Sequence, residues 1–266
     1  MNYVMNEKKF AEGILNGEGY GNNLQYTTAI IAKYFKSQGR GNKQIRETLD
    51  KLMDERIPHD TYFRWWEVKK RWVDRALSVA GKYPLYDFDE IVVTKPEMML
   101  VNSIHSDKFK DYRIRRLAFT LLCFAKFEEA RGKKDGWINI DNKDIFAAAD
   151  LKGLTNEKQC LMIHELYKAG YIDISPVIRI HGHEGIRIKY IQGGETELTI
   201  NNINEVGKIF RQYNGERMIR CKRCGKLVGA TGRRMKYCSS CAAVIDREKG
   251  RERKRKNREY LKMSDL

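Results

Sequence analysis

The sequence is poor in proline and has no long hydrophobic run. It contains 4 prolines in 266 residues and 42% hydrophobic residues, which excludes collagen-like, mucin-like and wholly disordered proteins. The longest apolar stretch, Leu117 to Ala125, holds nine residues including a threonine, whereas about 20 are needed to cross a bilayer. The N-terminus lacks a basic segment followed by an apolar one, so no secretory signal is expected. These absences predict a cytoplasmic protein without a membrane span.

Common catalytic motifs are also missing. The sequence contains no phosphate-binding P-loop, no nucleophile elbow and no His-Glu-x-x-His motif. Asp87, Asp89 and Glu90, with Lys95 beyond them, weakly resemble a metal-dependent nuclease pattern, but the neighbouring strand candidate is only three residues long. We therefore expect a binding protein and not an enzyme.

Basic residues are in clear excess. The chain has 51 Lys and Arg against 35 Asp and Glu, a formal net charge of +16. Residues 221–266 hold 15 basic and 5 acidic side chains, a net charge of +10, whereas residues 1–220 hold 36 and 30, a net charge of +6. Such a surplus favours polyanions through phosphate contacts and counterion release. The sequence predicts a nucleic-acid partner, DNA rather than RNA, that meets the C-terminal part of the chain.

The fold class predicted is mainly α with small β hairpins (α+β), and the length predicts two or three domains. Residues 1–82 are expected to form a helical bundle, because apolar residues recur there at steps of three and four. Phe63, Trp66, Val73 and Leu77 should lie on a buried stripe, with stacking of the tryptophans on nucleic-acid bases as the alternative. Residues 83–108 are interpreted as a connector. The helices expected in the bundle span residues 24–39, 43–53 and 61–80.

Residues 109–195 predict the order helix, strand, helix, turn, helix, strand, hairpin. This order resembles a winged helix-turn-helix over about 80 residues. The resemblance implies that residues 155–169 form the recognition helix, in which Asn156, Lys158 and Gln159 could reach base edges. The hairpin is predicted to pair residues 177–180 with 186–190. Its anion-facing side would carry Arg179, Arg187 and Lys189.

Three further interpretations concern the middle of the chain. Winged helices also serve as protein-binding or dimerising units, and Glu157 and Glu165 dilute the positive charge of the helix at 155–169. Residues 196–220 are interpreted as a linker with one short helix. Cys123 and Cys160 lie in apolar helical patterns and are expected to be buried.

The other four cysteines have metal-ligand spacing. Cys221 and Cys224 form one Cys-x-x-Cys pair, and Cys238 and Cys241 form a second one after thirteen residues. Four thiolates complete a zinc tetrahedron and leave no position open for a substrate, so one structural Zn²⁺ is predicted, with iron or a redox dithiol as the alternatives. Residues 221–266 would then be a treble-clef or zinc-ribbon finger with a basic C-terminal helix.

The segment after the finger has no large apolar residue from Asp246 to Glu259. It can be a solvated helix with internal ion pairs, or it can bind phosphates together with basic residues of the finger, which we prefer. The phosphate-contact candidates are Arg233, Arg234, Lys236, Arg247, Arg251, Arg253, Lys254, Arg255, Lys256 and Arg258.

Three blocks together are similar to a family of uncharacterised bacteriophage and mobile-element proteins of Gram-positive bacteria. The blocks are Leu117 to Phe127, Gly136 to Phe146, and Ile219 to Leu227 followed by Lys236-Tyr-Cys. The family has no assigned activity, so the resemblance implies a setting, the cytoplasm of a bacterial host, and no mechanism.

Three functions follow from these observations. The first is a DNA-binding phage protein for transcription or replication that uses the winged helix and the finger with its basic tail. The second is a viral interaction protein that binds and inhibits a host protein or nucleoprotein complex. The third is an RNA-binding regulator. The oligomeric state is left open, because no heptad run predicts a zipper.

Overall fold

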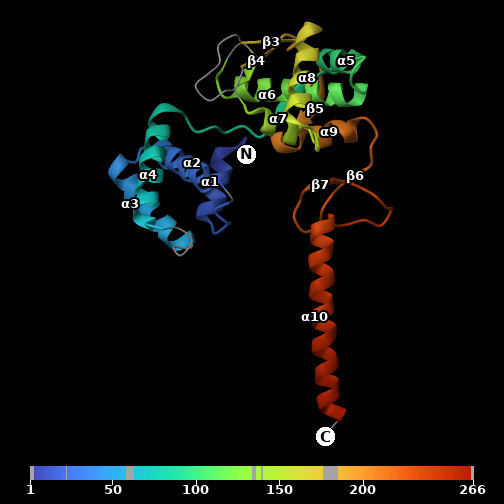
Figure 1. Ribbon diagram of the computed structural model, residues 1–266. Coiled ribbons are helices and arrows are strands. Elements are labelled where there is room, and N and C mark those ends of the chain that lie inside the picture. The colour runs from blue at the N-terminus through green and yellow to red at the C-terminus, as the bar shows by residue number, and fades with distance from the viewer. Residues whose placement is uncertain are drawn as a thin grey trace.

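The computed structural model describes residues 3–21, 23–57, 63–133, 136–138, 140–175 and 185–264, with side chains as far as residue 257. The protein is mainly helical and carries small antiparallel sheets, as predicted (Figure 1). Its buried apolar residues form two clusters, one among the N-terminal helices and one around a central helix. In the part of the chain described, no helix is both long enough and apolar enough to cross a membrane.

The first cluster lies among four helices. Asn6 and Asn23 cap the first two, since their side chains accept the backbone N–H groups of Lys9 and Tyr26. Buried Ile31, Ile45, Leu49, Met53 and Val73 fill the space between the helices. The helices are α1 (Glu7–Leu15), α2 (Leu24–Ser37), α3 (Asn42–Arg56) and α4 (Trp65–Lys82).

The prediction for the start of α4 was wrong. Phe63 is 89% exposed and Trp66 is 64% exposed, so neither lies on the buried stripe. The inner side of α4 instead carries Trp72 and Val73, and Trp65 packs edge to face on Trp72 with ring centroids 6.1 Å apart. Val73 lies inside as predicted, so the stripe was wrong only at its start, where both Trp65 and Trp66 fit a helical pattern.

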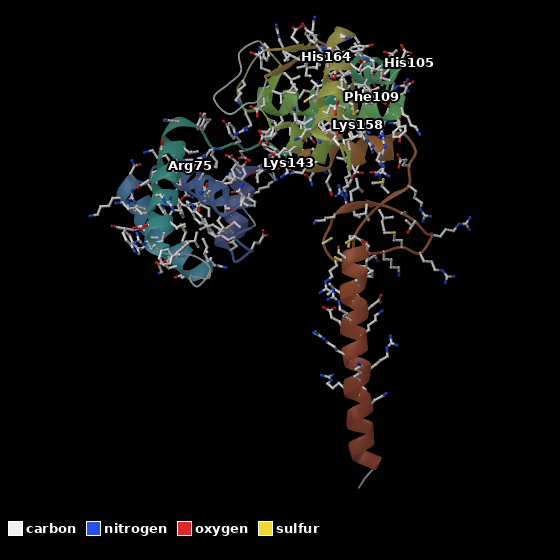
Figure 2. All side chains as sticks on the ribbon, viewed as in Figure 1. Arg75, His105, Phe109, Lys143, Lys158 and His164 are labelled. Carbon is white, nitrogen blue, oxygen red and sulfur yellow. The ribbon has the colours of Figure 1, made fainter. Side chains whose placement is uncertain are left out.

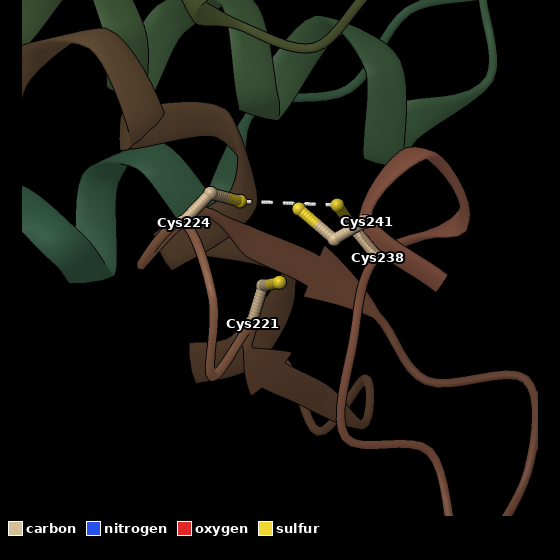
Figure 3. A group of neighbouring side chains, drawn as sticks. All are labelled: Cys221, Cys224, Cys238 and Cys241. Carbon is tan, nitrogen blue, oxygen red and sulfur yellow. Dashed lines mark hydrogen bonds between the residues drawn. The ribbon is translucent and has the colours of Figure 1, made fainter. Parts of the chain in front are cut away.

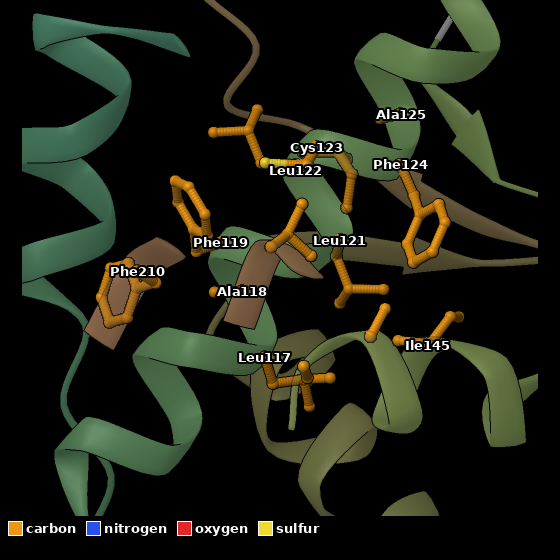
Figure 4. Packing of buried hydrophobic residues seen from close by; sticks show 14 of the residues in the cluster. Leu117, Ala118, Phe119, Leu121, Leu122, Cys123, Phe124, Ala125, Ile145 and Phe210 are labelled. Atoms are coloured by element: carbon orange, nitrogen blue, oxygen red, sulfur yellow. The ribbon is translucent and has the colours of Figure 1, made fainter. Parts of the chain in front are cut away.

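The second cluster surrounds α6 (Asp111–Ala130). Leu117 to Ala125 are all buried, and Phe119 stacks on Phe210 with ring centroids 4.9 Å apart (Figure 4). The longest apolar stretch of the sequence is therefore the centre of a globular core.

The segments interpreted as a connector and a linker belong to this core. Strand β1 (Ile91–Thr94) pairs antiparallel with β5 (Thr196–Ile200), and Ile91 faces Ile200 in the register. Ile91, Val93 and Ile200 are buried in the cluster around α6, which is why separately weak strand signals form one stable pair. The remaining elements here are α5 (Lys95–Ser103), the 3₁₀ turn η2 (Ile203–Glu205) and α9 (Val206–Tyr213).

A three-stranded antiparallel sheet with the order β2-β4-β3 also packs on α6. The predicted partner of residues 186–190 was wrong, because Ile186 faces Ile174 and Ile138, so β4 is bonded on both edges. Residues 177–180 lie outside the described residues. The elements of this part are β2 (Trp137–Ile138), α7 (Asn142–Ala148), α8 (Asn156–Lys168), β3 (Ile172–Ile174) and β4 (Ile186–Ile188).

The C-terminal part begins with a two-stranded sheet of β6 (Met218–Arg220) and β7 (Leu227–Gly229). The helix α10 (Ser239–Ser264) follows and extends away from the other elements (Figure 1). Strand β6 lies within residues 196–220, which were interpreted as a linker. The finger therefore starts before Cys221, its first cysteine. Leu227 is 3% exposed and belongs to the second cluster, which joins the finger to the core.

Candidate metal centre and nucleic-acid interface

Four cysteine side chains converge between the β6–β7 turn and the start of α10 (Figure 3). The Sγ atoms of Cys221, Cys224, Cys238 and Cys241 all lie within 4.8 Å of one another. Those of Cys224 and Cys238 are 3.8 Å apart. Four sulfurs at ~2.3 Å from a tetrahedral zinc ion are separated by about 3.8 Å. The cluster is therefore compatible with a structural metal site, and the predicted convergence of the two cysteine pairs is confirmed.

Local turn chemistry produces each cysteine pair. Gly225 has a φ of +69° directly after Cys224, a left-handed conformation that glycine adopts without strain. The turn is closed by the N–H of Gly225, which donates to the carbonyl of Cys221 at 2.9 Å. The second pair opens α10, where the N–H of Ala242 donates to the carbonyl of Cys238 at 2.9 Å. Both features follow from the sequence.

The surroundings of the sulfurs favour thiolates at two positions. Hydrogen bonds from the backbone, first of Cys238, lower the pKa of Cys221 to about 6. The Ser240 hydroxyl, 3.2 Å from the sulfur, is the main cause that lowers the pKa of Cys238. The pKa of Cys241 is raised to about 12, mainly by its hydrogen bond to Cys238. Cys221 and Cys238 thus ionise more easily than Cys241, because neighbouring thiolates repel one another. A bound cation would allow the remaining thiols to ionise as well.

An ion pair attaches α10 to the first cysteine turn. The two guanidinium Nη atoms of Arg223 contact the two carboxylate oxygens of Glu248 at 2.8 and 2.9 Å. Such a two-point contact fixes orientation as well as distance. The basic helix is therefore anchored at its base to the cysteine cluster. Its side chains project to both sides of the helix in the view of Figure 2.

The candidate phosphate contacts in the tail are all on α10. Their described side chains are exposed, and Arg258 lies on the helix beyond the last described side chain. Lys249 is exposed as well and was missed, although the net charge of the tail could have indicated it. The exposed candidates are Arg247, Arg251, Arg253, Lys254, Arg255 and Lys256.

The charges of α10 are sorted by side. Successive residues of an α-helix are turned by about 100°, so residues four and seven apart share a side. One basic side carries Arg247, Arg251 and Lys254, and a second carries Lys249, Arg253 and Lys256. Glu248 and Glu252 lie together between them, where Glu252 also pairs with Lys256 at 3.1 Å.

The side opposite the two glutamates is uncharged beyond Asp246, which lies on the same side near the base of α10. By the same rotation, Gly250 and Asn257 lie there, flanked by the two basic sides. The helix therefore has a small neutral side between two basic sides and an acidic side at its back. Composition predicts the charge of this segment, but the separation into sides appears only once the helix is continuous from Ser239.

The finger loop adds three exposed basic residues. Arg233, Arg234 and Lys236 are all exposed, and the loop is held by Arg217, whose Nη2 donates to the carbonyl of Arg233 at 3.1 Å. The Lys236 carbonyl accepts the N–H of Lys222 at 3.0 Å. These contacts place the loop beside the first cysteine turn.

The helix α8 carries the predicted base contacts, and Figure 2 labels Lys158 and His164 on it. Thr155 caps the helix as expected, since its hydroxyl accepts the N–H of Lys158 at 3.4 Å. Asn156 and Lys158 are exposed, whereas the amide of Gln159 is half-buried and donates to the carbonyl of Leu154 at 3.2 Å. Gln159 is thus engaged within its own turn.

The exposed side of α8 also carries apolar residues. Leu161 is 44% exposed and Tyr167 is 46% exposed. Cys160 is exposed too, so its predicted burial was wrong, whereas Cys123 is buried as predicted. The buried positions of α8 are Met162, Ile163 and Leu166, a stripe that leaves position 160 outside.

The predicted anion-facing side of the hairpin is partly described. Arg187 and Lys189 are exposed while Ile186, Ile188 and Tyr190 are buried, which confirms the alternation. Lys189 pairs with Asp173 at 3.5 Å. Arg179 lies outside the described residues. The structure does not bring α8 or β4 to the side of α10 (Figure 1).

The acidic cluster near the connector has a structural partner. Asn6 donates through Nδ2 to Asp87 at 2.8 Å and to Asp89 at 2.9 Å, and Lys9 pairs with Asp89 at 2.7 Å. These carboxylates therefore tie the start of α1 to the segment before β1.

No protein-family model, curated protein or solved structure matches this chain.

Proposed function

We propose that the protein binds duplex DNA through α10, held by a zinc-organised finger. The observation that carries the proposal is the arrangement of α10, which from residue 247 to residue 257 has a neutral side flanked by two basic sides and backed by an acidic one. A helix that is polar all round cannot bury a face in a protein core. Lysine and arginine at this density favour phosphate contacts.

The geometry favours B-form DNA over RNA. The major groove of B-DNA is about 12 Å wide and admits an α-helix, whose own diameter is about 10–12 Å. With Gly250 and Asn257 towards the groove floor, the two basic sides face the two phosphate strands, Glu252 faces solvent, and Glu248 stays paired with Arg223. The major groove of A-form RNA is too narrow for this arrangement.

Zinc is the metal that the cysteine cluster suits best. Four sulfur donors in a compact cluster are the typical ligand set of structural zinc, and they leave no open position for catalysis. The finger would be of the treble-clef or zinc-ribbon class, because a β-turn supplies the first cysteine pair and a helix start supplies the second.

A winged helix-turn-helix is supported for residues 109–195 by the order of its elements. Helix α6 is followed by β2, then α7 and α8, then β3 and β4, and the sheet order β2-β4-β3 places the last strand in the middle. Phosphate contact from Arg187, Lys189 and Lys158 would add to that of α10. The proposed setting, a phage or mobile-element protein in a bacterial cytoplasm, rests on the sequence resemblance alone.

A salt titration with matched variants tests the function. The full-length, zinc-loaded chain is titrated with a DNA duplex, a double-stranded RNA and a single strand of the same sequence. We expect the duplex DNA to bind most tightly and its affinity to fall steeply with salt. The double variant Arg251→Gln/Lys254→Gln should reduce the salt slope by about 1.8, because each phosphate contact contributes about 0.9.

The control is Glu252→Gln on the acidic side of α10, which should not weaken DNA binding. Absence of DNA binding even at low salt would overturn the proposal. Equal affinity for double-stranded RNA would instead favour the RNA-binding regulator.

The second candidate function is binding of a host protein through α8. Its exposed side carries Cys160, Leu161 and His164, which line a cavity of about 420 Å³ with α7 and β3. Exposed apolar groups around a hollow are typical of protein contacts. The variant Leu161→Asp separates the two functions, since it should abolish capture of a host protein while leaving duplex affinity unchanged.

A further inference from the structure

A second basic site lies between α6 and α9, away from α10. It is a cavity of about 100 Å³ whose lining includes Tyr112, Arg115, Arg116, Arg211 and Glu216. Three arginines from two helices therefore face one small space. The sequence does not predict it, because Arg211 lies 95 positions beyond Arg116.

Two of the three arginines have carboxylate partners. Arg115 contacts Asp111 at 3.3 Å and donates through Nε to the carbonyl of Ile104 at 2.8 Å. Arg211 contacts Asp150 at 2.6 Å, and its Nε donates to Glu216 at 2.8 Å. The one carboxylate that lines the cavity is thus engaged by Arg211.

Arg116 is the exception. The residue is 8% exposed, and its Nε has no hydrogen-bond partner within the described part of the chain. Its contact is the ring of Tyr112, with the guanidinium carbon 5.9 Å from the centroid. Burial is the main cause that lowers the pKa of Arg116, while the nearby Asp150 carboxylate acts in the opposite direction. Buried charges in proteins are as a rule paired, so this guanidinium calls for an anion.

We propose that the cavity at Arg116 binds a single phosphate group. A guanidinium presents donors in a planar fork that matches two oxygens of a phosphate. The space is about three times the ~30 Å³ that a water molecule occupies in the liquid, which suits one small anion. Arg115 and Asn214, which line the same space, supply further donors.

The phosphate can come from two sources. Helix α9 packs on both strands of the finger, so a nucleic acid held by the finger passes close to the helix that carries Arg211. A phosphodiester of that nucleic acid would then occupy the cavity. A free phosphate or nucleotide has the same chemistry. The site itself does not depend on α10 or on the proposed function.

The test measures unfolding of the full-length, zinc-loaded chain in inorganic phosphate and in chloride at matched ionic strength. Phosphate should raise the unfolding midpoint of the natural chain. Arg116→Met should unfold in chloride at the same midpoint or a higher one, since an uncompensated buried charge is removed. Its phosphate affinity should fall by about tenfold or more, because charge-assisted hydrogen bonds are lost. The control Arg113→Met, on the same helix, should keep the phosphate response.

Two results would overturn the proposal. One is an equal response to phosphate in the natural chain and in Arg116→Met. The other is a destabilised Arg116→Met in chloride together with a retained phosphate response, which would make Arg116 a packing residue. If Arg116→Met does not fold, phosphorus NMR of phosphate with the natural chain and with Arg116→Lys decides, and absence of saturable binding by the natural chain counts against the site.

Duplex binding then identifies the source. A weaker duplex affinity of Arg116→Met than of Arg113→Met supports a phosphodiester of the nucleic acid. An unchanged duplex affinity with a lost phosphate response supports a free phosphate or a mononucleotide. A chain that binds phosphate here but no DNA would overturn the proposed function and leave this site in place.

Discussion

The carboxylate of Glu205 accepts a hydrogen bond from the backbone N–H of Leu227 at 2.8 Å. Glu205 is 7% exposed and belongs to η2 in the second core, whereas Leu227 begins the second strand of the finger. The same carboxylate lies 3.4 Å from Arg220 and 3.8 Å from Lys208. A buried, charge-balanced carboxylate thus joins the finger to the core, so the base of α10 is not on a free linker.

Replacing Glu205 should loosen this junction. Glu205→Ala leaves the buried N–H of Leu227 without its acceptor, which costs about 1–3 kcal/mol. Urea unfolding should show the loss, and limited proteolysis should cut near residues 214–220 sooner than in the natural chain. Glu205→Gln, which keeps an acceptor oxygen, should lose less. Equal protease resistance of the natural chain and Glu205→Ala would contradict a docking role.

Removing the metal should unfold the finger and spare the core. The finger is too small to bury a sufficient core, so metal binding supplies much of its folding free energy. A strong chelator should increase hydrogen exchange in residues 221–241 but not in α6. The metal content should fall as the pH falls, because protons compete for the thiolates.

A pair of cysteine variants distinguishes a metal ligand, Cys238, from a cysteine outside the cluster, Cys160. Cys238→Ser should weaken metal binding by more than the about tenfold to 100-fold that outer-shell changes cost. Cys160→Ser changes an exposed thiol outside the cluster and should leave one metal ion per chain. Elemental analysis of the purified variants measures both, and full metal content in Cys238→Ser would exclude it as a ligand.

A side chain at Gly207 should disturb the packing of α9. A Cβ there would lie 2.2 Å from the carbonyl carbon and oxygen of Ala149 at the end of α7, so the backbone must move. Gly207→Ala is expected to cost about 1–3 kcal/mol or more. Gly81→Ala, in α4, meets no atom within 4 Å and should be neutral or stabilising by up to about 1 kcal/mol. Thermal unfolding of both variants compares them directly.

The buried pair of Lys33 and Glu7 joins α1 to α2. Their side chains are 3% and 2% exposed, and Glu7 also accepts the N–H of Tyr86 at 3.0 Å. Desolvation is the main cause that lowers the pKa of Lys33. Lys33→Met alone leaves a buried unpaired carboxylate and should cost about 3–5 kcal/mol.

The double variant Lys33→Met/Glu7→Gln should recover part of that loss, because no charge then remains buried. Denaturant unfolding gives the coupling free energy between the two sites. Purely additive effects would show that the pair contributes nothing as a pair.

Local chemistry made part of the structure predictable. Thr155 as a helix cap, Gly225 after Cys224 and the alternation from Ile186 to Tyr190 act through neighbours in the sequence, and each is found where expected. The phase of α4 at Trp66 and the exposure of Cys160 were wrong, because periodicity alone does not decide between adjacent apolar residues. The pairing of β4 was wrong as well, because one of its two partners, Trp137, lies 50 positions before Arg187 in the sequence.

The sequence by itself determined the composition of α6, the two cysteine pairs and the charge of the tail, since each depends on residues a few positions apart. Tertiary structure alone decided that β1 pairs with β5, that Glu205 holds the finger and that Arg116 faces Arg211. The physical reason is distance along the chain. Contacts between residues a hundred positions apart depend on how the core packs, and no local pattern records that packing.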